Sequence, residues 1–452
     1  MAEQVDAVVV GMGPGGEDVA GRLAEAGLSV VGVESRLVGG ECPYWGCVPS
    51  KMMIRAADAL AEAGRVRELA GTASVRPDWA PVARRIRDEA TDHWDDTVAV
   101  KRFEDKGGRF VRGRARLSGP STVSVDGTDY EAATAVVIAV GTEPAAPPIP
   151  GLAGTSYWSN REAVETTEVP RSLAVIGGGA VGLEFAQVFA RFGSQVTVIE
   201  AADRLIPLEE PEVGDLIAAV FRGEGLSVIT GARIAQISCD GESFRIELAD
   251  APPVQADRLL VATGRRADLS ALGVAVAGLD ESARFVAVDE HLRAGERLWA
   301  VGDITGKGAF THVAMYQARI AATDILGLPH EPADYRALPR VTFTDPELGA
   351  VGLTEDQARK QSITVSIAVT QVPSSARGWI HKAGNDGLIK LVADRDAGVL
   401  VWATSAGPAG GEVLSALAVA VHGRVPISVL AEMIYAYPTF HRGIEDAIRG
   451  LR

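Results

Sequence analysis

The chain contains one glycine-rich pattern twice, and this repeat restricts the possible folds more than any other feature. Each copy has an apolar segment, a glycine turn, a helix-like segment and a second apolar segment that ends in glutamate. The turn glycines and terminal acids are Gly11, Gly13, Gly16 and Glu34 in the first copy, and Gly177, Gly179, Gly182 and Glu200 in the second. The first glycine of the turn and the terminal glutamate are 23 residues apart in both copies (34 − 11 and 200 − 177). The repeat therefore predicts two βαβ units, each in a parallel sheet.

Units of this kind are typical of dinucleotide binding. The glycines let the backbone approach a pyrophosphate, the helix N-terminus stabilises its charge, and the terminal carboxylate accepts a ribose hydroxyl. Each copy later returns with a strand and a small-residue turn, at 136–142 with Gly141 and at 259–266 with Gly264. The interval from the first glycine to this later glycine is 43 residues longer in the first copy (130 against 87). We therefore expect two bound dinucleotides and an insertion in the first unit.

The insertion contains two close cysteines. Cys42 and Cys47 stand in the run GGECPYWGCVPSK (39–51), with four residues between them. Thiols at this spacing can close a small, reducible ring, and a flavin bound nearby would exchange electrons with it. The alternatives are two unreacted buried thiols or a zinc site, but other Cys and His ligands at metal spacing are missing. The pattern favours a dithiol/disulfide redox enzyme.

Charge and cysteine content argue against several other classes. The net charge of −15 disfavours nucleic acid or an anionic membrane as a partner, because both attract clustered Lys and Arg. Only three cysteines are present among 452 residues, which excludes a secreted disulfide framework and indicates a reducing, cytoplasmic setting. The sequence shows no basic leader and no apolar run of membrane length, so we expect neither a secretory signal nor a membrane span.

With VGD at 301–303 and VTFTDPELGAVGLTE at 341–355, these motifs resemble the pyridine nucleotide-disulfide oxidoreductases over essentially the whole chain. That family includes dihydrolipoamide dehydrogenase, glutathione reductase and mercuric reductase. The resemblance implies an α/β fold with two Rossmann-like dinucleotide-binding domains and a C-terminal α+β dimerisation domain. The implied boundaries are an FAD-binding domain at 1–148 completed by 265–334, an NAD(P)-binding domain at 149–264 and an interface domain at 335–452. The resemblance also implies a homodimer whose active site is built from both subunits.

The resemblance assigns cofactor contacts residue by residue. Those assigned to FAD are Gly11, Gly13, Gly16, Glu34, Gly40, Lys51, Ala115, Gly141, Asp303 and Ala314. Those assigned to the nicotinamide cofactor are Gly177, Gly179, Gly182, Glu200 and Gly264. Glu200 favours NAD over NADP, because a carboxylate accepts a hydrogen bond from a free 2′-hydroxyl and repels a 2′-phosphate. Arg204, four residues later, is the competing signal.

In the family pattern the second cysteine faces the flavin and the first exchanges with substrate. By this resemblance Cys47 faces the flavin and Cys42 is the exchanging thiol. Only a thiolate attacks a disulfide well, so both cysteines depend on electrostatic help. Lys51 matches the lysine that approaches the reactive flavin nitrogen, and Glu184 matches its ion-pair partner.

The C-terminal stretch departs from the family. The usual HPTxxE pattern supplies a His base, held by a Glu five residues later, to the disulfide of the other subunit. Here AYPTFHRGIEDA has Tyr437 in the His position and Arg442 in the Glu position. Tyrosine, with a reference pKa of about 10, is a poor base at neutral pH but can donate a hydrogen bond or a proton. An offset pair of His441 and Glu445 is one replacement, and a surface helix with an incidental His is the other interpretation.

The substrate stays open between three classes. The main hypothesis is NADH-dependent turnover of a small disulfide or dithiol. The alternatives are a quinone or metal-ion reductase, and a flavoprotein redox partner or sensor, including a partner within a multienzyme complex. Mercuric reductases carry a Tyr in a similar stretch, but they add a C-terminal cysteine pair that this chain lacks. Tyr44 and Trp45 are bulkier than their counterparts in lipoamide and glutathione enzymes. Three roles are open for these rings: they narrow the approach to the disulfide, they stack on a flat quinone, or they only pack against their neighbours.

Overall fold

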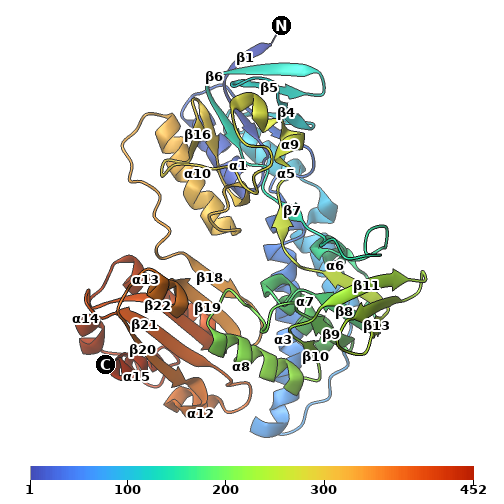
Figure 1. Ribbon diagram of the computed structural model, residues 1–452, viewed down its shortest axis with the longest axis vertical. Coiled ribbons are helices and arrows are strands. Elements are labelled where there is room, and N and C mark those ends of the chain that lie inside the picture. The colour runs from blue at the N-terminus through green and yellow to red at the C-terminus, as the bar shows by residue number, and fades with distance from the viewer. Residues whose placement is uncertain (1, 452) are drawn as a thin grey trace. The chain divides into compact units, whose positions relative to one another are not determined.

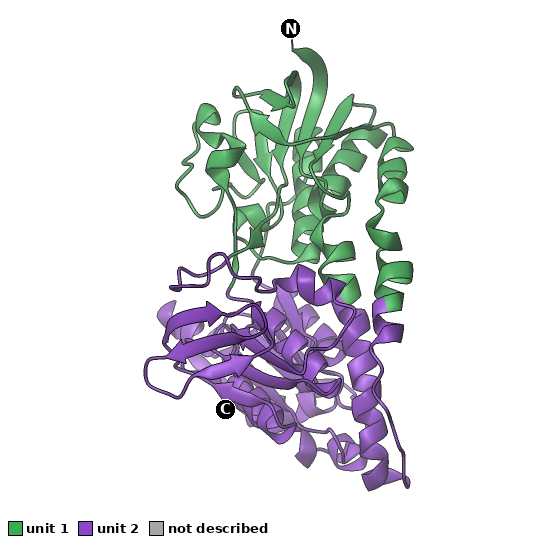
Figure 2. Ribbon diagram, turned by 90° about the vertical axis from the view of Figure 1, so that its right-hand side faces the viewer, with its two compact units in different colours: residues 1–49, 84–145, 264–335 green, residues 50–83, 146–263, 336–452 purple. Residues whose placement is uncertain are grey.

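The computed structural model describes residues 2–451 and divides into two compact units (Figures 1 and 2). Unit 1 comprises residues 1–49, 84–145 and 264–335, and unit 2 comprises residues 50–83, 146–263 and 336–452. The long helix α3 (Cys47–Leu69) begins in unit 1 and continues in unit 2. The three-domain boundaries expected from the family stay a prediction.

Unit 1 is built on an eight-stranded sheet with the path β16-β17-β6-β1-β2-β3, and β4 and β5 extend from β6. Its strands are β1 (Glu3–Val10), β2 (Val30–Glu34), β3 (Arg109–Arg112), β4 (Ala115–Leu117), β5 (Thr122–Val125), β6 (Thr128–Ile138), β16 (Arg293–Gly295) and β17 (Leu298–Ala300), and a separate ribbon pairs β7 (Glu143–Pro144) with β15 (Arg265–Arg266). Its helices are α1 (Pro14–Glu25), α2 (Glu41–Tyr44), α5 (Thr97–Glu104), α9 (Leu269–Leu272) and α10 (Thr311–Ile325), and α4 (Ala80–Arg85) crosses from unit 2 into unit 1.

The sheet is mixed, with parallel pairing in its centre and antiparallel pairing of β16, β4 and β5, and its central strand β1 is covered on both faces. This strand pairs in parallel with β2 and β6, with Val8 opposite Val31 and Val136. Alternate side chains of β1 enter two different cores: Ala7 and Val9 pack in the cluster that contains α1 and α10, whereas Val8 packs in the opposite one. A strand buried on both faces reads as a continuous apolar run, which is what DAVVV shows.

Unit 2 contains a parallel sheet. It has the order β10-β9-β8-β14, beside a three-stranded antiparallel sheet β11-β12-β13. The strands are β8 (Ser172–Ile176), β9 (Gln195–Ile199), β10 (Ser227–Ile229), β11 (Ile234–Cys239), β12 (Phe244–Leu248), β13 (Val254–Ala256) and β14 (Arg258–Val261), and the helices are α6 (Asn160–Glu165), α7 (Ala180–Arg191) and α8 (Pro211–Gly223).

The rest of unit 2 is a five-stranded antiparallel sheet with the order β18-β19-β22-β21-β20. Its elements are β18 (Pro339–Thr342), β19 (Glu347–Gly352), α11 (Glu355–Lys360), β20 (Val365–Gln371), α12 (Ala376–His381), β21 (Leu388–Asp394), β22 (Val399–Gly407), α13 (Gly410–His422), α14 (Ile427–Glu432) and α15 (Gly443–Gly450). Apolar residues of α13 and α15 pack on one face of this sheet, and Trp402 is buried on the other. Two βαβ units with parallel central strands and an α+β C-terminal part confirm the predicted α/β fold class.

Short helical turns of 3-10 or π type follow several elements, at Ile86–Ala90, Asp92–Trp94, Val274–Ala277, Asp303–Thr305 and Val372–Ser374. Within residues 2–451 no helix is both long enough and apolar enough to cross a membrane.

Candidate active site

The first glycine turn joins β1 to α1 and is closed by Glu34. Gly11 has φ +93°, and a Cβ on Gly16 would lie 1.9 Å from the Gly11 carbonyl oxygen, so neither position accepts a side chain. Glu34, at the end of β2, accepts hydrogen bonds from Met12 N–H at 2.9 Å and from Arg36 N–H at 2.8 Å. The carboxylate is therefore fixed beside the turn and keeps acceptor positions for a hydroxyl.

The second glycine turn repeats this geometry in unit 2. A Cβ on Gly182 would lie 2.1 Å from the Gly177 carbonyl oxygen. Glu200, at the end of β9, accepts from Gly178 N–H at 2.5 Å and from Ala202 N–H at 2.7 Å. The donors are one residue after the first glycine and two residues after the glutamate, as in the first copy. The two turns are thus the same local structure.

Both turns leave space where a phosphate would lie. Gly13 and Gly179 are the N-caps of α1 and α7, and neither helix has a side chain that caps its first N–H groups. A Cβ on Gly179 would meet nothing within 4 Å, and one on Gly13 would only reach Gly40 at 4.0 Å. Exposed N–H groups at a helix N-terminus bind anions. The residues present therefore fit a pyrophosphate at each turn.

The later glycines also face open space. A Cβ on Gly141 or on Gly264 would meet no atom within 4 Å, and both have positive φ. Ala115 begins β4 and packs at the edge of a core cluster, whereas Ala314 is buried on α10. A Cβ on Gly15 would lie 3.2 Å from that of Ala314, so α10 packs directly on the helix of the first turn.

Arg204 does not face a phosphate position in unit 2. Its guanidinium donates to the carbonyl oxygens of Pro207 at 2.9 Å and Glu209 at 3.2 Å. Its aliphatic part lies against Gly214, where a Cβ would meet the Arg204 Cδ at 3.3 Å. Part of the Arg204 guanidinium, the group that would favour NADP, is therefore held by the loop before α8, whereas its buried Nε has no hydrogen-bond partner.

Gly40 brings the cysteine segment against the first glycine turn. Gly40 has φ +67°, and a Cβ there would lie 2.9 Å from the Gly13 Cα. Gly39 N–H donates to the Met12 carbonyl oxygen at 2.7 Å. A side chain at position 40 would push the two segments apart, so the glycine pair places α2 directly beside the proposed nucleotide turn.

Cys42 and Cys47 lie at neighbouring helix ends. Cys42 is in α2 and is half-buried, whereas Cys47 begins α3 and is more exposed. Both are in the thiol form, the reduced state of the predicted pair. The Sγ of Cys47 lies 3.5 Å from the Oγ1 of Thr311, the first residue of α10. Two helix N-termini, those of α3 and α10, therefore meet at this thiol, and both favour negative charge.

The two thiols are not equivalent. The hydrogen bond with Cys47 and burial raise the pKa of Cys42 well above its usual range, against the opposing effect of Thr311. Cys42 therefore holds its proton in the reduced pair. Cys42 must lose this proton before it can attack a disulfide, because a thiol is a poor nucleophile.

Asp303 lies in a polar cluster with residues of the ribbon β7-β15. Its carboxylate accepts from Thr142 Oγ1 at 2.9 Å, and Arg265 donates to the same hydroxyl at 2.9 Å. The guanidinium of Arg265 also lies 3.9 Å from Asp303 and 3.7 Å from Glu41. Burial raises the pKa of Asp303, while Thr142 and Arg265 oppose that rise. Arg265 thus links the carboxylate assigned to the flavin with the helix that carries Cys42.

Lys51 and Glu184 form an ion pair in unit 2. The Lys51 Nζ lies 2.7 Å from Glu184 Oε2, and the other oxygen accepts from Phe343 N–H at 2.9 Å. The ammonium also lies over the Phe343 ring, 4.6 Å from its centre. Glu184 has only 8% of its side chain exposed, so the pair is partly desolvated and correspondingly strengthened.

Further polar contacts join α3 to α7 beyond this ion pair. Lys51, Asp58 and Arg65 are seven residues apart and share one face of α3. Asp58 lies 2.7 Å from Arg191 of α7, and both Arg65 and Arg191 bind Asp345, at 2.5 and 2.7 Å. We call Asp58, Arg65, Arg191 and Asp345 the α3 clamp. It fixes the helix that begins at Cys47 to the rest of unit 2.

His441 and Glu445, the offset pair considered from the sequence, each contact other residues, and their role stays a prediction. His441 precedes α15, and its Nδ1 lies 3.0 Å from Thr439 Oγ1. Glu445 binds Arg442 at 2.6 Å and also Arg449. The segment before α15 is already turned, since Ile444 N–H donates to the His441 carbonyl oxygen at 3.0 Å, but the Glu445 carboxylate is directed to arginines.

Tyr437 is exposed, with 69% of its surface accessible, and contacts Arg442 through its ring. A cavity of about 180 Å³ lies here in unit 2. Its lining consists of Ser375, Ala376, Arg377, Tyr437, Pro438, Thr439, Arg442, Gly443 and Asp446. Two arginines and one aspartate make this lining suited to an anionic or polar group.

The aromatic residues between the cysteines are packed. Tyr44 is 6% exposed, and its hydroxyl donates to the Asp95 carbonyl oxygen at 3.4 Å. Burial and the nearby Asp96 raise the pKa of Tyr44 to about 12. Trp45 is half-buried, with its ring 5.8 Å from that of Tyr44. Of the three roles considered for Tyr44, its burial favours packing.

Three contact residues were missed by sequence reasoning. Thr311 touches the cysteine pair, Arg265 joins Asp303 to Glu41, and Phe343 holds the Lys51–Glu184 pair. Arg265 and Phe343 lie within motifs that were noticed, ATGRR and VTFTDPELGAVGLTE, but their roles depend on tertiary contacts. Thr311 follows Asp303 by eight residues, and no spacing rule points to it.

Family models, sequence relatives and solved structures all match this chain over nearly its whole length. The family model for pyridine nucleotide-disulphide oxidoreductase matches residues 5–318, and the model for the dimerisation domain of these enzymes matches residues 338–448. Dihydrolipoyl dehydrogenase of Zymomonas mobilis is 31% identical over 99% of this chain and 98% of its own length. Mercuric reductase of Streptomyces lividans is 33% identical over 98% of this chain and 95% of its own length. The Cu(II) complex of the flavoprotein disulfide reductase RclA from Escherichia coli has a TM-score of 0.86 at 25% identity, covering 99% of both chains.

Proposed function

Because the chain belongs to the pyridine nucleotide-disulphide oxidoreductase family, whose members use FAD and NAD(P)H and carry a dimerisation domain, we propose how its own residues perform this chemistry. The proposed reaction is the two-electron reduction of a small disulfide to two thiols by NADH and a proton, or its reverse. The observation that supports it most directly is the meeting of Cys42, Cys47 and Thr311 at the start of α3 and α10.

Each proposed cofactor site is supported by the chain's own geometry. FAD, held by the first turn with Glu34 and Asp303, supplies two-electron transfer between the nicotinamide and the dithiol pair. NAD is held by the second turn and Glu200. The hydrogen bonds of Arg204 to the carbonyl oxygens of Pro207 and Glu209 support NAD over NADP, because they hold this cation in the loop before α8.

Cys47 is proposed as the thiol that carries negative charge in the reduced pair. It begins α3, contacts Thr311 at the start of α10, and precedes Lys51 by one turn of the same helix. Glu184 is proposed to orient Lys51 rather than to react, since its second oxygen is held by the Phe343 backbone. The raised pKa of Cys42 fits this division, because the proton stays on the exchanging thiol.

Tyr437 is proposed to reach the cysteine pair of the other subunit, where it serves as a hydrogen-bond donor rather than a base. Arg442 occupies the position of the usual Glu and lies against the Tyr437 ring, so this position supplies a cation in place of the carboxylate that would support a base. Exchange at Cys42 is then limited by loss of its own proton. We propose a small, polar or anionic disulfide as substrate, consistent with Arg377 and Arg442 beside the cavity.

A metal-ion reductase is the second candidate. Tyr437 supports it, since tyrosine fills a similar position in mercuric reductases, and so do the mercuric reductase relatives and the Cu(II) complex of RclA. A quinone reductase receives less support, because the ring of Tyr44, considered for stacking on a quinone, is buried. A reducing, cytoplasmic setting and a possible multienzyme partner also belong to the proposal.

Anaerobic titration of the FAD-loaded protein with NADH tests the main proposal. Uptake of four electrons per flavin, with a long-wavelength absorbance band, is expected when the cysteine pair is coupled to the flavin. Cys42→Ser should abolish disulfide reduction but leave direct reduction of a quinone largely intact. Uptake of only two electrons by the wild-type protein, without the band, overturns the proposal.

A further inference from the structure

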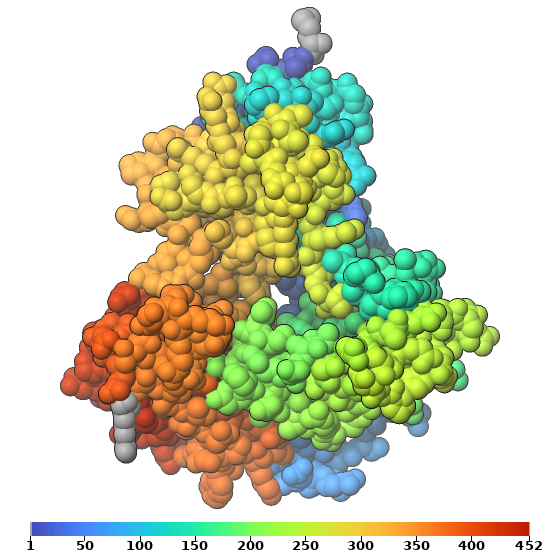
Figure 3. Space-filling view, in the orientation of Figure 1, coloured from blue at the N-terminus to red at the C-terminus, as the bar shows by residue number. Residues whose placement is uncertain are grey.

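Three potential metal ligands converge in unit 1, outside the nucleotide turns and the cysteine pair. His291 lies in the turn before β16, Asp324 is near the end of α10, and His330 follows that helix. The ligand atoms of the three side chains all lie within 4.8 Å of one another. All three belong to the segment 264–335, which is yellow to light orange in Figure 3 and forms part of the surface of unit 1.

The two imidazoles are arranged for a shared proton or a shared cation. His291 Nδ1 lies 2.9 Å from His330 Nε2. The other nitrogen of His330, Nδ1, lies 3.0 Å from the Leu328 carbonyl oxygen, which only an N–H can satisfy. This contact fixes the tautomer of His330 and leaves a lone pair on Nε2. A backbone carbonyl that holds the second nitrogen of a His is the usual outer contact of metal ligands.

Asp324 is held in place and has one acceptor position directed at the histidines. Arg293 donates to both carboxylate oxygens, at 2.6 and 2.8 Å, and Trp299 Nε1 donates to Oδ2 at 2.9 Å. These bonds use three of the four lone pairs of the carboxylate. The remaining one is on Oδ1, the oxygen that lies 3.8 Å from His330 Nε2. The side chain is 6% exposed, so its orientation is fixed by these contacts.

The distances between the ligand atoms suit one first-row transition-metal ion after small movements of the side chains. Two nitrogens each about 2.1 Å from one ion lie about 3 Å apart at a right angle and about 3.4 Å apart at the tetrahedral angle. The observed 2.9 Å between the imidazole nitrogens already matches the first case. Mixed imidazole and carboxylate ligands favour ions such as Zn²⁺ over Mg²⁺ and Ca²⁺, which prefer oxygen.

We propose that His291, Asp324 and His330 bind a divalent transition-metal ion of the Zn²⁺ type, with water in the remaining positions. Binding breaks the N–H···N bond between the imidazoles and forms bonds from His291 Nδ1 and His330 Nε2 to the ion, while the His291 proton moves from Nδ1 to Nε2, so both rings stay neutral. The ion ties the turn before β16 to the end of α10. No electron transfer is involved.

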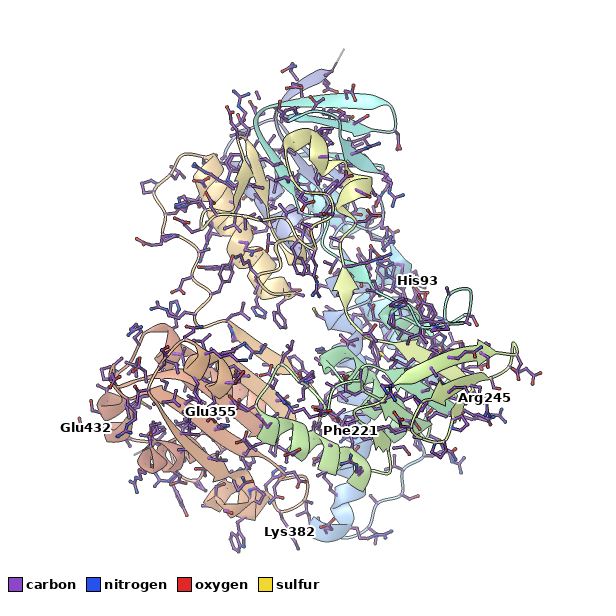
Figure 4. All side chains as sticks on the ribbon, viewed as in Figure 1. His93, Phe221, Arg245, Glu355, Lys382 and Glu432 are labelled. Atoms are coloured by element: carbon purple, nitrogen blue, oxygen red, sulfur yellow. The ribbon has the colours of Figure 1, made fainter. Side chains whose placement is uncertain are left out.

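The test is calorimetric titration of ZnCl₂ into FAD-loaded protein that carries Cys42→Ser and Cys47→Ser, so that the redox thiols do not bind the ion. Saturable binding is expected, and H291A or H330A should weaken it at least about tenfold. His93→Ala is the matched control, because His93, labelled in Figure 4, lies 3.5 Å from Asp88 without a second imidazole. Binding should be unchanged in this control.

Absence of saturable binding, or an unchanged Kd in H291A and H330A, overturns the proposal. Flavin content and circular dichroism identify a variant that has not folded. A Zn²⁺-soaked crystal of the parent protein gives an answer without variants, through anomalous scattering at the zinc edge. A peak about 2.0–2.2 Å from His291 Nδ1 and His330 Nε2 supports the site, and a bound ion elsewhere rejects it.

Discussion

The guanidinium of Arg442 lies 5.5 Å from the centre of the Tyr437 ring, so the two residues that replace the family's His and Glu contact each other. In the usual pattern the carboxylate supports an imidazole base. Here a cation lies on an aromatic face, an attraction that holds the ring in place but supplies no proton acceptor. The C-terminal stretch therefore keeps the geometry of a paired unit and loses its basicity.

Restoring the family pattern should raise exchange with thiol substrates. We expect Tyr437→His together with Arg442→Glu to increase dihydrolipoamide turnover near neutral pH at least about tenfold, because a positioned base accelerates proton removal. The measurement is steady-state kcat/KM for dihydrolipoamide oxidation. Tyr437→Phe keeps the ring and serves as control. No gain in the double variant, with flavin content unchanged, contradicts the proposed role of this stretch.

Reduction of a small disulfide should be faster in alkaline solution. Hydrogen bonding to Cys47 and burial raise the pKa of Cys42, so its thiolate form is scarce at neutral pH and grows as pH rises. We expect kcat/KM for the disulfide to increase from about pH 6 to about pH 9 without a plateau near neutrality. Direct quinone reduction by the same preparation is the control and should lack this slope. A flat profile for the disulfide refutes the assignment of Cys42 as the protonated exchanging thiol.

Removing the charge of Glu200 should change the choice of nicotinamide cofactor. Glu200→Gln keeps an oxygen for Gly178 N–H but no longer repels a 2′-phosphate. We expect the ratio of kcat/KM for NADH to that for NADPH to fall at least about tenfold. Asp203→Asn removes one negative charge from an exposed position on the same loop and should leave the ratio near its original value. An equal effect in both variants would indicate long-range charge rather than contact.

The α3 clamp should make stability depend on pH in mildly acidic solution. Burial raises the pKa of Asp58 to about 6, although Arg191 opposes the rise. A carboxyl whose pKa is higher in the folded protein favours folding below its unfolded pKa of about 4, and this contribution is lost as pH rises through about 6. Relative to Asp58→Asn, the Tm of the parent should therefore decline between these pH values.

Scanning calorimetry across this range measures the difference between parent and Asp58→Asn. Glu62→Gln is the control on the same helix, because Glu62 pairs with Arg65 at an exposed position, with 57% of its side chain accessible. Its difference from the parent should not follow the same curve. If the parent and Asp58→Asn have parallel pH profiles, the raised pKa is not linked to folding.

Lys390 should be required for the stability of unit 2. Its side chain is 2% exposed and lies 2.9 Å from Glu210, which is equally buried, and 3.3 Å from Glu355, labelled in Figure 4. Lys390→Met leaves a buried carboxylate without its cation, so we expect a loss of about 3–5 kcal/mol in the free energy of unfolding. Chemical denaturation measures this loss. Adding Glu210→Gln should recover part of it.

An exposed ion pair provides the comparison for Lys390. Lys360 pairs with Asp356 at 2.6 Å, but both side chains are more than 70% accessible. Lys360→Met should change the free energy of unfolding by less than about 1 kcal/mol, because water and salt screen such pairs. Similar losses in Lys390→Met and Lys360→Met would contradict the assigned importance of burial.

The local units of this fold were predictable because they depend on short-range rules. Gly11 and Gly177 each start a turn after an apolar strand, and the intervals to Glu34 and Glu200 follow from one βαβ geometry. The structure confirms both βαβ units, each with its two strands in parallel. The alternation of Ala7, Val8 and Val9 between two cores likewise follows from the period of a strand.

The contacts that tune the candidate site were not predictable, since they join residues distant in sequence. Thr311 reaches Cys47 across 264 positions, and Arg265 reaches Thr142 across 123. Spacing rules describe one helix or one strand and give no information on such pairs. The same holds for Glu445: its spacing from His441 does not reveal that Arg442 and Arg449 bind its carboxylate.

Glu34 and Glu200 make equivalent hydrogen bonds at equivalent positions, and this identity bears on how such a chain can arise. A turn whose hydrogen bonds stay within one local segment can be duplicated in a gene and keep the same geometry in both copies. Discrimination between the two copies then evolves outside the duplicated part, through the inserted cysteine segment after one copy and the loop around Arg204 after the other. Ancestral reconstruction is best directed at those flanking segments, where the two halves diverged.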